Sequence, residues 1–163
     1  MPDWADIGGS SAYIERRKEA QERALRIGLP SFEEELWRYT PIDELDLSNY
    51  KLDVPGGTVL DAGLTEGLDS DAAAVIHVVN GKVSPIATFD ESISVQSEGD
   101  ELENIIGSVV SPEFDFFADC NLAYNTAPIF IEIAPNSVVT SPILIRHHTT
   151  VNNLVWFPRV FIH

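Results

Sequence analysis

Residues 128–163 read PIFIEIAPNSVVTSPILIRHHTTVNNLVWFPRVFIH, and this stretch decides the fold expected of the chain. Its apolar runs are short, at residues 129–133, 138–139, 143–145 and 154–163, and corners rich in Pro, Asn, Ser and Thr separate them. Short strands with turns at close spacing are typical of a meander or of a right-handed β-helix beginning to wind. We therefore expect residues 128–163 to be β structure of one of these two kinds.

The sequence ends inside an apolar run, Val160-Phe161-Ile162-His163. A domain seldom ends on an unpaired hydrophobic strand, because an open edge invites aggregation. We therefore expect the sequence to be truncated at His163, with further short β repeats and then helices beyond it.

Residues 48–127 are expected to form a small α/β module. Apolar runs at residues 75–79 and 82–86 flank Asn80-Gly81, the dipeptide that favours a type I′ hairpin turn, and a third strand is expected at residues 93–95. Two helices follow. The first starts at Asp100 and ends before Pro112, and the second has a buried face of Phe116, Phe117, Cys120, Ala123 and Tyr124.

Residues 11–47 are expected to form a helical hairpin after a flexible tail at residues 1–10. The first helix runs to about Arg26, and Gly28 and Pro30 end it. Ser31 and Glu34 then form a capping box that starts a second, short helix before Pro41. The fold class expected is thus α+β: a helical hairpin, a small α/β module and the start of a right-handed β-helix.

The charge of the chain is strongly negative and unevenly distributed. The sequence contains ten Lys and Arg residues and 26 Asp and Glu residues, which gives a formal charge of -16. Residues 27–135 hold three basic and 21 acidic side chains, whereas residues 136–163 hold Arg146, Arg159 and no acid. Binding to nucleic acid or to an anionic membrane needs clustered Lys and Arg, so neither partner is expected. The acidic start and the single cysteine favour a cytoplasmic protein.

Individual residues indicate no active site. Cys120 is the only thiol, and its apolar neighbours favour a packing role over a nucleophile or a metal ligand. His147 and His148 are adjacent in an expected strand, so their rings point to opposite faces and do not share one ion. His77 is expected to be a half-exposed sheet residue, and the acidic segments 69–71 and 98–101 to be solvated. We therefore expect no catalytic, cofactor-binding or metal-binding residue and no cofactor in this chain.

Three collinear segments resemble one family, and they span about residue 11 to the end of the sequence. Leu29-Pro30-Ser31 with Glu35-Leu36-Trp37-Arg38-Tyr39-Thr40-Pro41-Ile42 resembles the "LPT…ExWRYTPL" signature of SufD-type proteins. Residues 106–110 and 115–124 resemble the family's "LG…D.F.ALN.AF" segment, with Cys120 in place of its usual apolar residue. Residues 129–143 resemble "vFiyVPkgvvve.PI", and Pro158-Arg159-Val160-Phe161-Ile162 is similar to the "PRvlI" strand after it.

The resemblance implies a non-enzymatic scaffold of the SUF iron–sulfur cluster assembly machinery. In that family SufD pairs with the related SufB through their β-helices, and each binds the ATPase SufC through C-terminal helices. The residues proposed to handle iron or sulfur are expected beyond His163, so none is assigned here. For Trp37-Arg38-Tyr39, a contact with a partner competes with ordinary packing in which Arg38 pairs with a carboxylate.

Two other functions remain open. A carbohydrate-active β-helix enzyme would need paired carboxylates on a groove-facing sheet, and Glu132 is the only acid in residues 129–163. An acidic protein-interaction module of unrelated function is the third hypothesis.

Overall fold

The computed structural model describes residues 9–52, 71–110, 115–126 and 128–163, and it has mixed helices and sheets, as an α+β fold requires. The elements in chain order are α1 (Ser11–Ile27), the 3₁₀ turns η1 (Ile42–Glu44) and η2 (Leu47–Asn49), β1 (Ala74–Val79), β2 (Lys82–Thr88), β3 (Ile93–Gln96), α2 (Asp100–Ile105), α3 (Phe116–Tyr124), β4 (Pro128–Ile133), β5 (Ile143–His148) and β6 (Arg159–Ile162).

The hairpin predicted at Asn80-Gly81 is confirmed. Strands β1 and β2 pair antiparallel, with Val79 opposite Lys82 across the turn. Asn80 and Gly81 have φ angles of 52° and 80°, the left-handed conformations that a type I′ turn requires at both positions.

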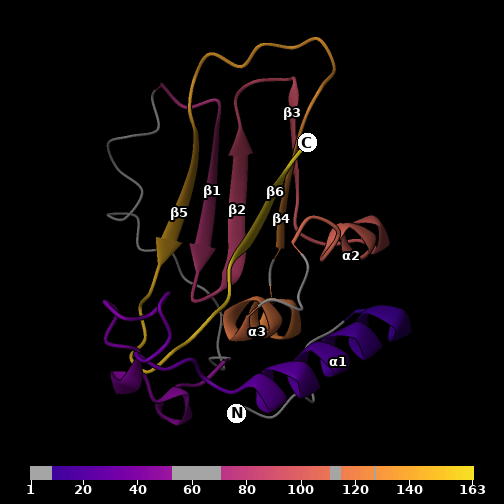
Figure 1. Cartoon of the computed structure of the whole chain (residues 1–163). Coiled ribbons are helices and arrows are strands. Elements are labelled where there is room, and N and C mark those ends of the chain that lie inside the picture. The colour runs from indigo at the N-terminus through magenta and orange to yellow at the C-terminus, as the bar shows by residue number, and fades with distance from the viewer. Residues whose placement is uncertain (1–8, 53–70, 111–114, 127) are drawn as a thin grey trace.

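The strands form two three-stranded sheets, in the orders β2-β1-β5 and β3-β4-β6. The pairs β1–β2 and β3–β4 are antiparallel, whereas β5 is parallel to β1 and β6 is parallel to β4. The chain therefore alternates between the sheets after α3, since β4, β5 and β6 lie in the second, the first and the second sheet in turn (Figure 1). Strand β2 is one terminal strand of the first sheet and β3 is one of the second, so β5 and β6 are the terminal strands at the other end of each order.

A hydrophobic core lies between the two sheets. Ala74, Ile76 and Val78 alternate along β1 and pack in one cluster with Ile129 and Ile131 of β4. Alternate residues of a strand face one side of the sheet, so this set defines the inner face of each sheet. All six residues of β1 are nevertheless buried, because β1 is the central strand of its sheet and both of its faces are covered.

Helices α1 and α3 pack against each other at one end of the strands (Figure 1). The side chain of Ser10 accepts a hydrogen bond from the Tyr13 backbone N–H and so caps the start of α1. Gly28 ends α1 as expected, with a φ of 77° and its N–H donating to the Ala24 carbonyl. Asp115 caps α3 by accepting from the Ala118 N–H.

The second arm of the predicted helical hairpin is not an α-helix. Successive three-residue turns occupy this segment, with the Glu34, Trp37 and Thr40 N–H groups donating to carbonyls three residues earlier. Half of the predicted capping box forms, because the Ser31 N–H donates to Glu34 at 3.0 Å. The ten residues between Pro30 and Pro41 are too few to offset the cost of helix nucleation. The capping residues Ser31 and Glu34 are therefore bonded to each other, but no α-helix follows them.

The strand predicted at residues 93–95 is confirmed as β3, whereas the helix predicted to start at Asp100 is shorter than expected. Helix α2 ends at Ile105, because Gly107 takes a φ of 86°, and Val109 is left exposed. Strand β3 pairs with β4 and does not extend the hairpin. Residues 138–139 form no strand, and of the run 154–163 only residues 159–162 do so.

Candidate functional site

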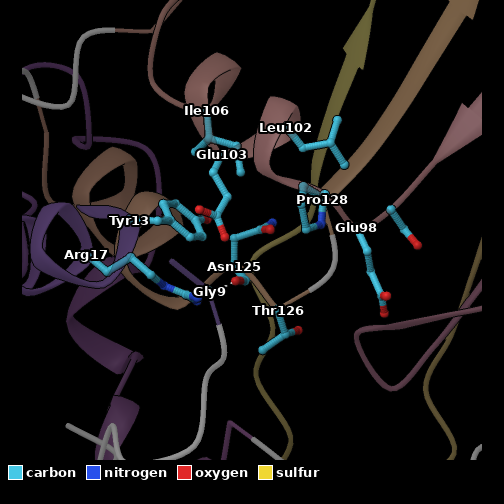
Figure 2. A pocket seen from close by; sticks show the side chains of 12 residues that line it. Gly9, Tyr13, Arg17, Glu98, Leu102, Glu103, Ile106, Asn125, Thr126 and Pro128 are labelled. Atoms are coloured by element: carbon cyan, nitrogen blue, oxygen red, sulfur yellow. Dashed lines mark hydrogen bonds between the residues drawn. The ribbon is translucent and has the colours of Figure 1, made fainter. Parts of the chain in front are cut away.

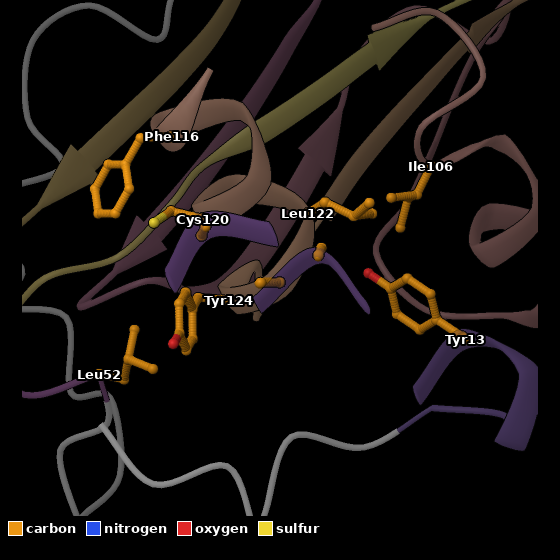
Figure 3. Packing of buried hydrophobic residues seen from close by; sticks show 10 residues of the cluster. Tyr13, Leu52, Ile106, Phe116, Cys120, Leu122 and Tyr124 are labelled. Atoms are coloured by element: carbon orange, nitrogen blue, oxygen red, sulfur yellow. The ribbon is translucent and has the colours of Figure 1, made fainter. Parts of the chain in front are cut away.

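Cys120 is a packing residue, as the sequence predicts. It is fully buried in the cluster between α1 and α3, with Phe116, Tyr124 and Leu52 (Figure 3). Burial raises the pKa of the Cys120 thiol to about 12, and the neighbouring carboxylates of Asp119 and Asp115 add to the shift. A thiol with such a pKa is almost wholly protonated at neutral pH and is a poor nucleophile or metal ligand.

Next to Cys120, a partly buried ion pair joins the two helices. Asp119 of α3 accepts from the guanidinium of Arg23 of α1 at 2.9 Å, and the Asp119 side chain has no exposed surface. Burial raises the pKa of Asp119, and the Arg23 guanidinium opposes this effect. This pair was not expected from the sequence, because its two residues are 96 positions apart.

His77 is buried, which corrects the expectation of a half-exposed residue. Its Nδ1 lies 3.1 Å from Nε2 of His148 on the neighbouring strand β5, and the ring centroids are 5.3 Å apart with the planes inclined by 20°. With the two nitrogens so close and the centroids so far apart, the nitrogens must point at each other nearly along the line between the rings. This arrangement fits an N–H···N hydrogen bond and leaves no room for a metal ion, which needs about 2 Å to each nitrogen.

His147 lies beside a different ring from its neighbour His148. Its imidazole stacks on the indole of Trp156 with centroids 6.5 Å apart, so the two adjacent histidines have different partners, as strand alternation predicts. Within the described ranges, no three His, Cys, Asp or Glu side chains gather as a metal site would require.

A polar cavity of about 330 Å³ lies between α1, α2 and the start of β4. Tyr13 and Arg17 of α1 and Glu103 of α2 line it together with Asn125 and Thr126, which follow α3 (Figure 2). Arg17 is buried and held in place, because its Nε donates to the Ala123 carbonyl at 2.8 Å and its guanidinium lies 4.9 Å from the centre of the Tyr13 ring.

Two buried polar atoms of this cavity lack a hydrogen-bond partner among the described residues, the Tyr13 hydroxyl and Oδ1 of Asn125. Burial raises the pKa of Tyr13, although the Arg17 guanidinium opposes the shift. The carboxylate of Glu103 accepts from the Ser10 N–H at 2.9 Å and so joins the start of α1 to α2. The cavity therefore holds a hydroxyl and an amide oxygen able to bind a small polar molecule or water, but its described lining shows no pairing of a nucleophile with a base.

The outer edges of the terminal strands β5 and β6, here called together the strand edge, are the strongest candidate for an interaction site. Each is a terminal strand in the order of its sheet. The His163 N–H donates to the Ile131 carbonyl, and its own carbonyl accepts from Ile133. Because backbone bonding direction alternates along a strand, the N–H and C=O groups of Val160 and Ile162 point away from β4.

Charge at the strand edge differs from that of the rest of the chain. Residues 136–163 contain no acidic side chain, and Val160 and Ile162 are exposed apolar residues. Arg159 at the start of β6 is half-buried, and burial lowers its pKa. An exposed strand with apolar side chains and little charge is suited to pairing with a further strand.

The Trp-Arg-Tyr box at residues 37–39 combines packing with exposure. Trp37 packs on Phe117 of α3 with ring centroids 5.3 Å apart, and Arg38 pairs with Glu35 at 3.0 Å, as the packing interpretation expects. Tyr39 is 90% exposed and Leu36 is 91% exposed. The packing interpretation therefore accounts for Trp37 and Arg38 but leaves two large apolar side chains in solvent.

Comparison with protein-family models gives no match to this chain, and comparison with curated proteins gives none either. In the part of the chain that the structure describes, no helix has both the length and the apolar character needed to cross a membrane.

Proposed function

We propose that this chain is a SufD-like, non-enzymatic scaffold component of iron–sulfur cluster assembly. It would act in the cytoplasm, in a complex with a SufB-like partner and a SufC-like ATPase. The sequence resemblance, with its Trp-Arg-Tyr-Thr-Pro box, supports this proposal.

The observation that carries the proposal is the strand edge. The path from β4 to β5 to β6 advances each sheet by one parallel strand, which is the connectivity of one coil of a β-solenoid. On this proposal the coil is the first of a right-handed β-helix, and the outward groups of β6 are where a further coil or a partner's strand pairs.

The carbohydrate-enzyme alternative has less support. Retaining and inverting glycosidases both need two carboxyl groups beside the bond they cleave. Glu132 is the only acid of residues 128–163, and it is an exposed residue on β4.

Co-purification tests the proposal. The affinity-tagged 163-residue chain is co-expressed with the SufB-like and SufC-like proteins encoded in the same genome. We expect the SufB-like protein to be retained, and the SufC-like ATPase to follow only when the SufB-like protein is present.

A matched pair of variants locates the contact. Val160→Pro removes an N–H that points away from β4, so it spares the β4–β6 ladder while deleting one edge hydrogen bond. We expect retention to fall about fivefold. Val138→Pro, at an exposed loop position, is the control and should bind normally. Absence of both partners from the eluate would contradict the function, and equal retention of the two variants would contradict the edge.

A further inference from the structure

A second surface, separate from the strand edge, lies where α1 ends. Leu25, Leu29, Leu45, Leu47 and Phe116 line an apolar groove of about 360 Å³, here called the leucine groove. The groove brings together the end of α1, residues 45–48 at the start of η2, and the first residue of α3.

Exposed apolar side chains are frequent in the part of the chain that supplies most of this groove, and two of them, Leu25 and Leu29, line it. Half of the exposed large hydrophobic residues in the described part of the chain lie between residues 25 and 50: Leu25, Ile27, Leu29, Phe32, Leu36, Tyr39 and Tyr50. A concentration of this kind, beside a groove, is characteristic of a surface that a partner covers.

The charge of the same segment restricts the partner. Residues 29–50 carry six acidic side chains and one basic one. The basic residue, Arg38, forms the one ion pair found in this described segment, with Glu35. Asp46 lines the groove itself, and hydrogen bonds from Ser48 lower its pKa, so it is charged at neutral pH.

These charges disfavour three alternative occupants. A second copy of this chain would bring the same excess of acids to the contact, and like charges brought together oppose association. Anionic lipid and nucleic acid carry the same sign as the segment and are repelled. A partner with an apolar stripe flanked by Lys and Arg satisfies both the groove and its charge.

We propose that the leucine groove binds a basic amphipathic helix of a partner protein. The apolar positions of that helix, spaced i, i+3, i+4 and i+7, enter between Leu25 and Leu47, and its basic positions meet Asp43, Glu44 and Asp46. This contact involves neither β5 nor β6, so it is independent of the proposed scaffold function.

The test uses an 18-residue synthetic peptide with leucines at those positions and lysines elsewhere, labelled with fluorescein. Fluorescence anisotropy measures its binding to the whole chain. Two control peptides accompany it: a scrambled sequence of the same composition, and a version with glutamate in place of lysine. We expect binding of the first peptide only, weakening as salt is added.

Variants of the chain localise the binding. We expect Leu25→Gln to weaken it about tenfold, because one leucine contact is lost. Leu36→Gln is the matched control, since Leu36 is more exposed than Leu25 and does not line the groove. The double variant Asp43→Asn/Glu44→Gln should weaken binding of the peptide about threefold and reduce the salt dependence of that binding. Its control, Glu91→Gln/Glu132→Gln, makes the same change in net charge elsewhere on the chain and should weaken binding less.

Each contrary outcome would overturn the proposal. Equal binding of the scrambled peptide would show attraction by charge alone. Equal effects of Leu25→Gln and Leu36→Gln would place the contact outside the groove. If sedimentation shows that the chain dimerises and that Leu25→Gln abolishes the dimer, the groove binds a second copy of the chain. If the chain floats with phosphatidylserine vesicles, the groove binds a membrane. Circular dichroism confirms that each variant is folded.

Discussion

Replacing Gly81 with alanine tests how the hairpin turn is seated on the rest of the molecule. Gly81 has a φ of 80°, a conformation that costs an L-residue about 1–2 kcal/mol. A Cβ at this position would lie 2.7 Å from Cβ of Trp156 and 3.1 Å from its Cγ. The first of these contacts is too close for two carbon atoms, so either the turn or the segment before β6 must move.

A second variant separates the steric cost of Gly81→Ala from its conformational cost. Gly28 has a φ of 77°, and a Cβ there would meet no atom within 4 Å. Gly28→Ala therefore carries only a conformational cost, of about 1–3 kcal/mol, because a φ of 77° with a ψ of 170° is a backbone conformation essentially restricted to glycine. Gly81→Ala adds an overpacking cost of about 1–3 kcal/mol, which gives a total of about 2–5 kcal/mol.

Urea denaturation followed by circular dichroism measures both variants against the parent chain. For a chain of 163 residues, thermal denaturation should place the melting temperature of Gly81→Ala about 4–20 °C below that of the parent chain. A loss of only about 1–2 kcal/mol in Gly81→Ala would refute the reasoning, because the conformational cost alone would then account for it and the turn would not contact Trp156 closely.

Two further predictions concern buried groups. Cys120 should react with iodoacetamide at pH 8 far more slowly in the native chain than in urea, because burial raises the pKa of its thiol to about 12. A Val138→Cys/Cys120→Ala control, which carries its thiol at an exposed position, should react quickly. Fast labelling of Cys120 in the native chain would contradict the packing role. Tyr13→Phe should raise the free energy of unfolding by about 1 kcal/mol, since it deletes a buried hydroxyl that lacks a partner among the described residues while keeping the ring beside Arg17. A loss of stability in that variant would reveal a hydrogen bond to the hydroxyl.

Features set by neighbouring residues could be predicted from the sequence. The Asn80-Gly81 turn, the Gly28 end of α1 and the burial of Cys120 each depend on a few adjacent positions, and all three agree with the structure. The segment at residues 31–40 shows the limit of such signals. Its capping residues are present, but its length between two prolines decides the outcome.

Features set by distant residues could not be predicted. Arg17 is buried because carbonyls at the end of α3, such as that of Ala123, satisfy its guanidinium, and these groups are more than 100 positions away. His77 is buried because β5 places His148 beside it. Strand β3 pairs with β4 although it follows the hairpin in sequence. In each case the deciding partner arrives through the topology of the fold, and no local pattern marks it.

The separation of charge along the chain matches the two proposed contacts. Pairing at the strand edge brings backbones within about 5 Å of each other, where like charges on facing side chains would oppose association. Residues 136–163 carry no acid, so a related, equally acidic partner can approach this edge without that penalty. The leucine groove is bordered instead by a segment with six acids, which attracts a basic partner and repels an acidic one. On these two proposals, the uneven charge directs an acidic partner to the strand edge and a basic partner to the leucine groove.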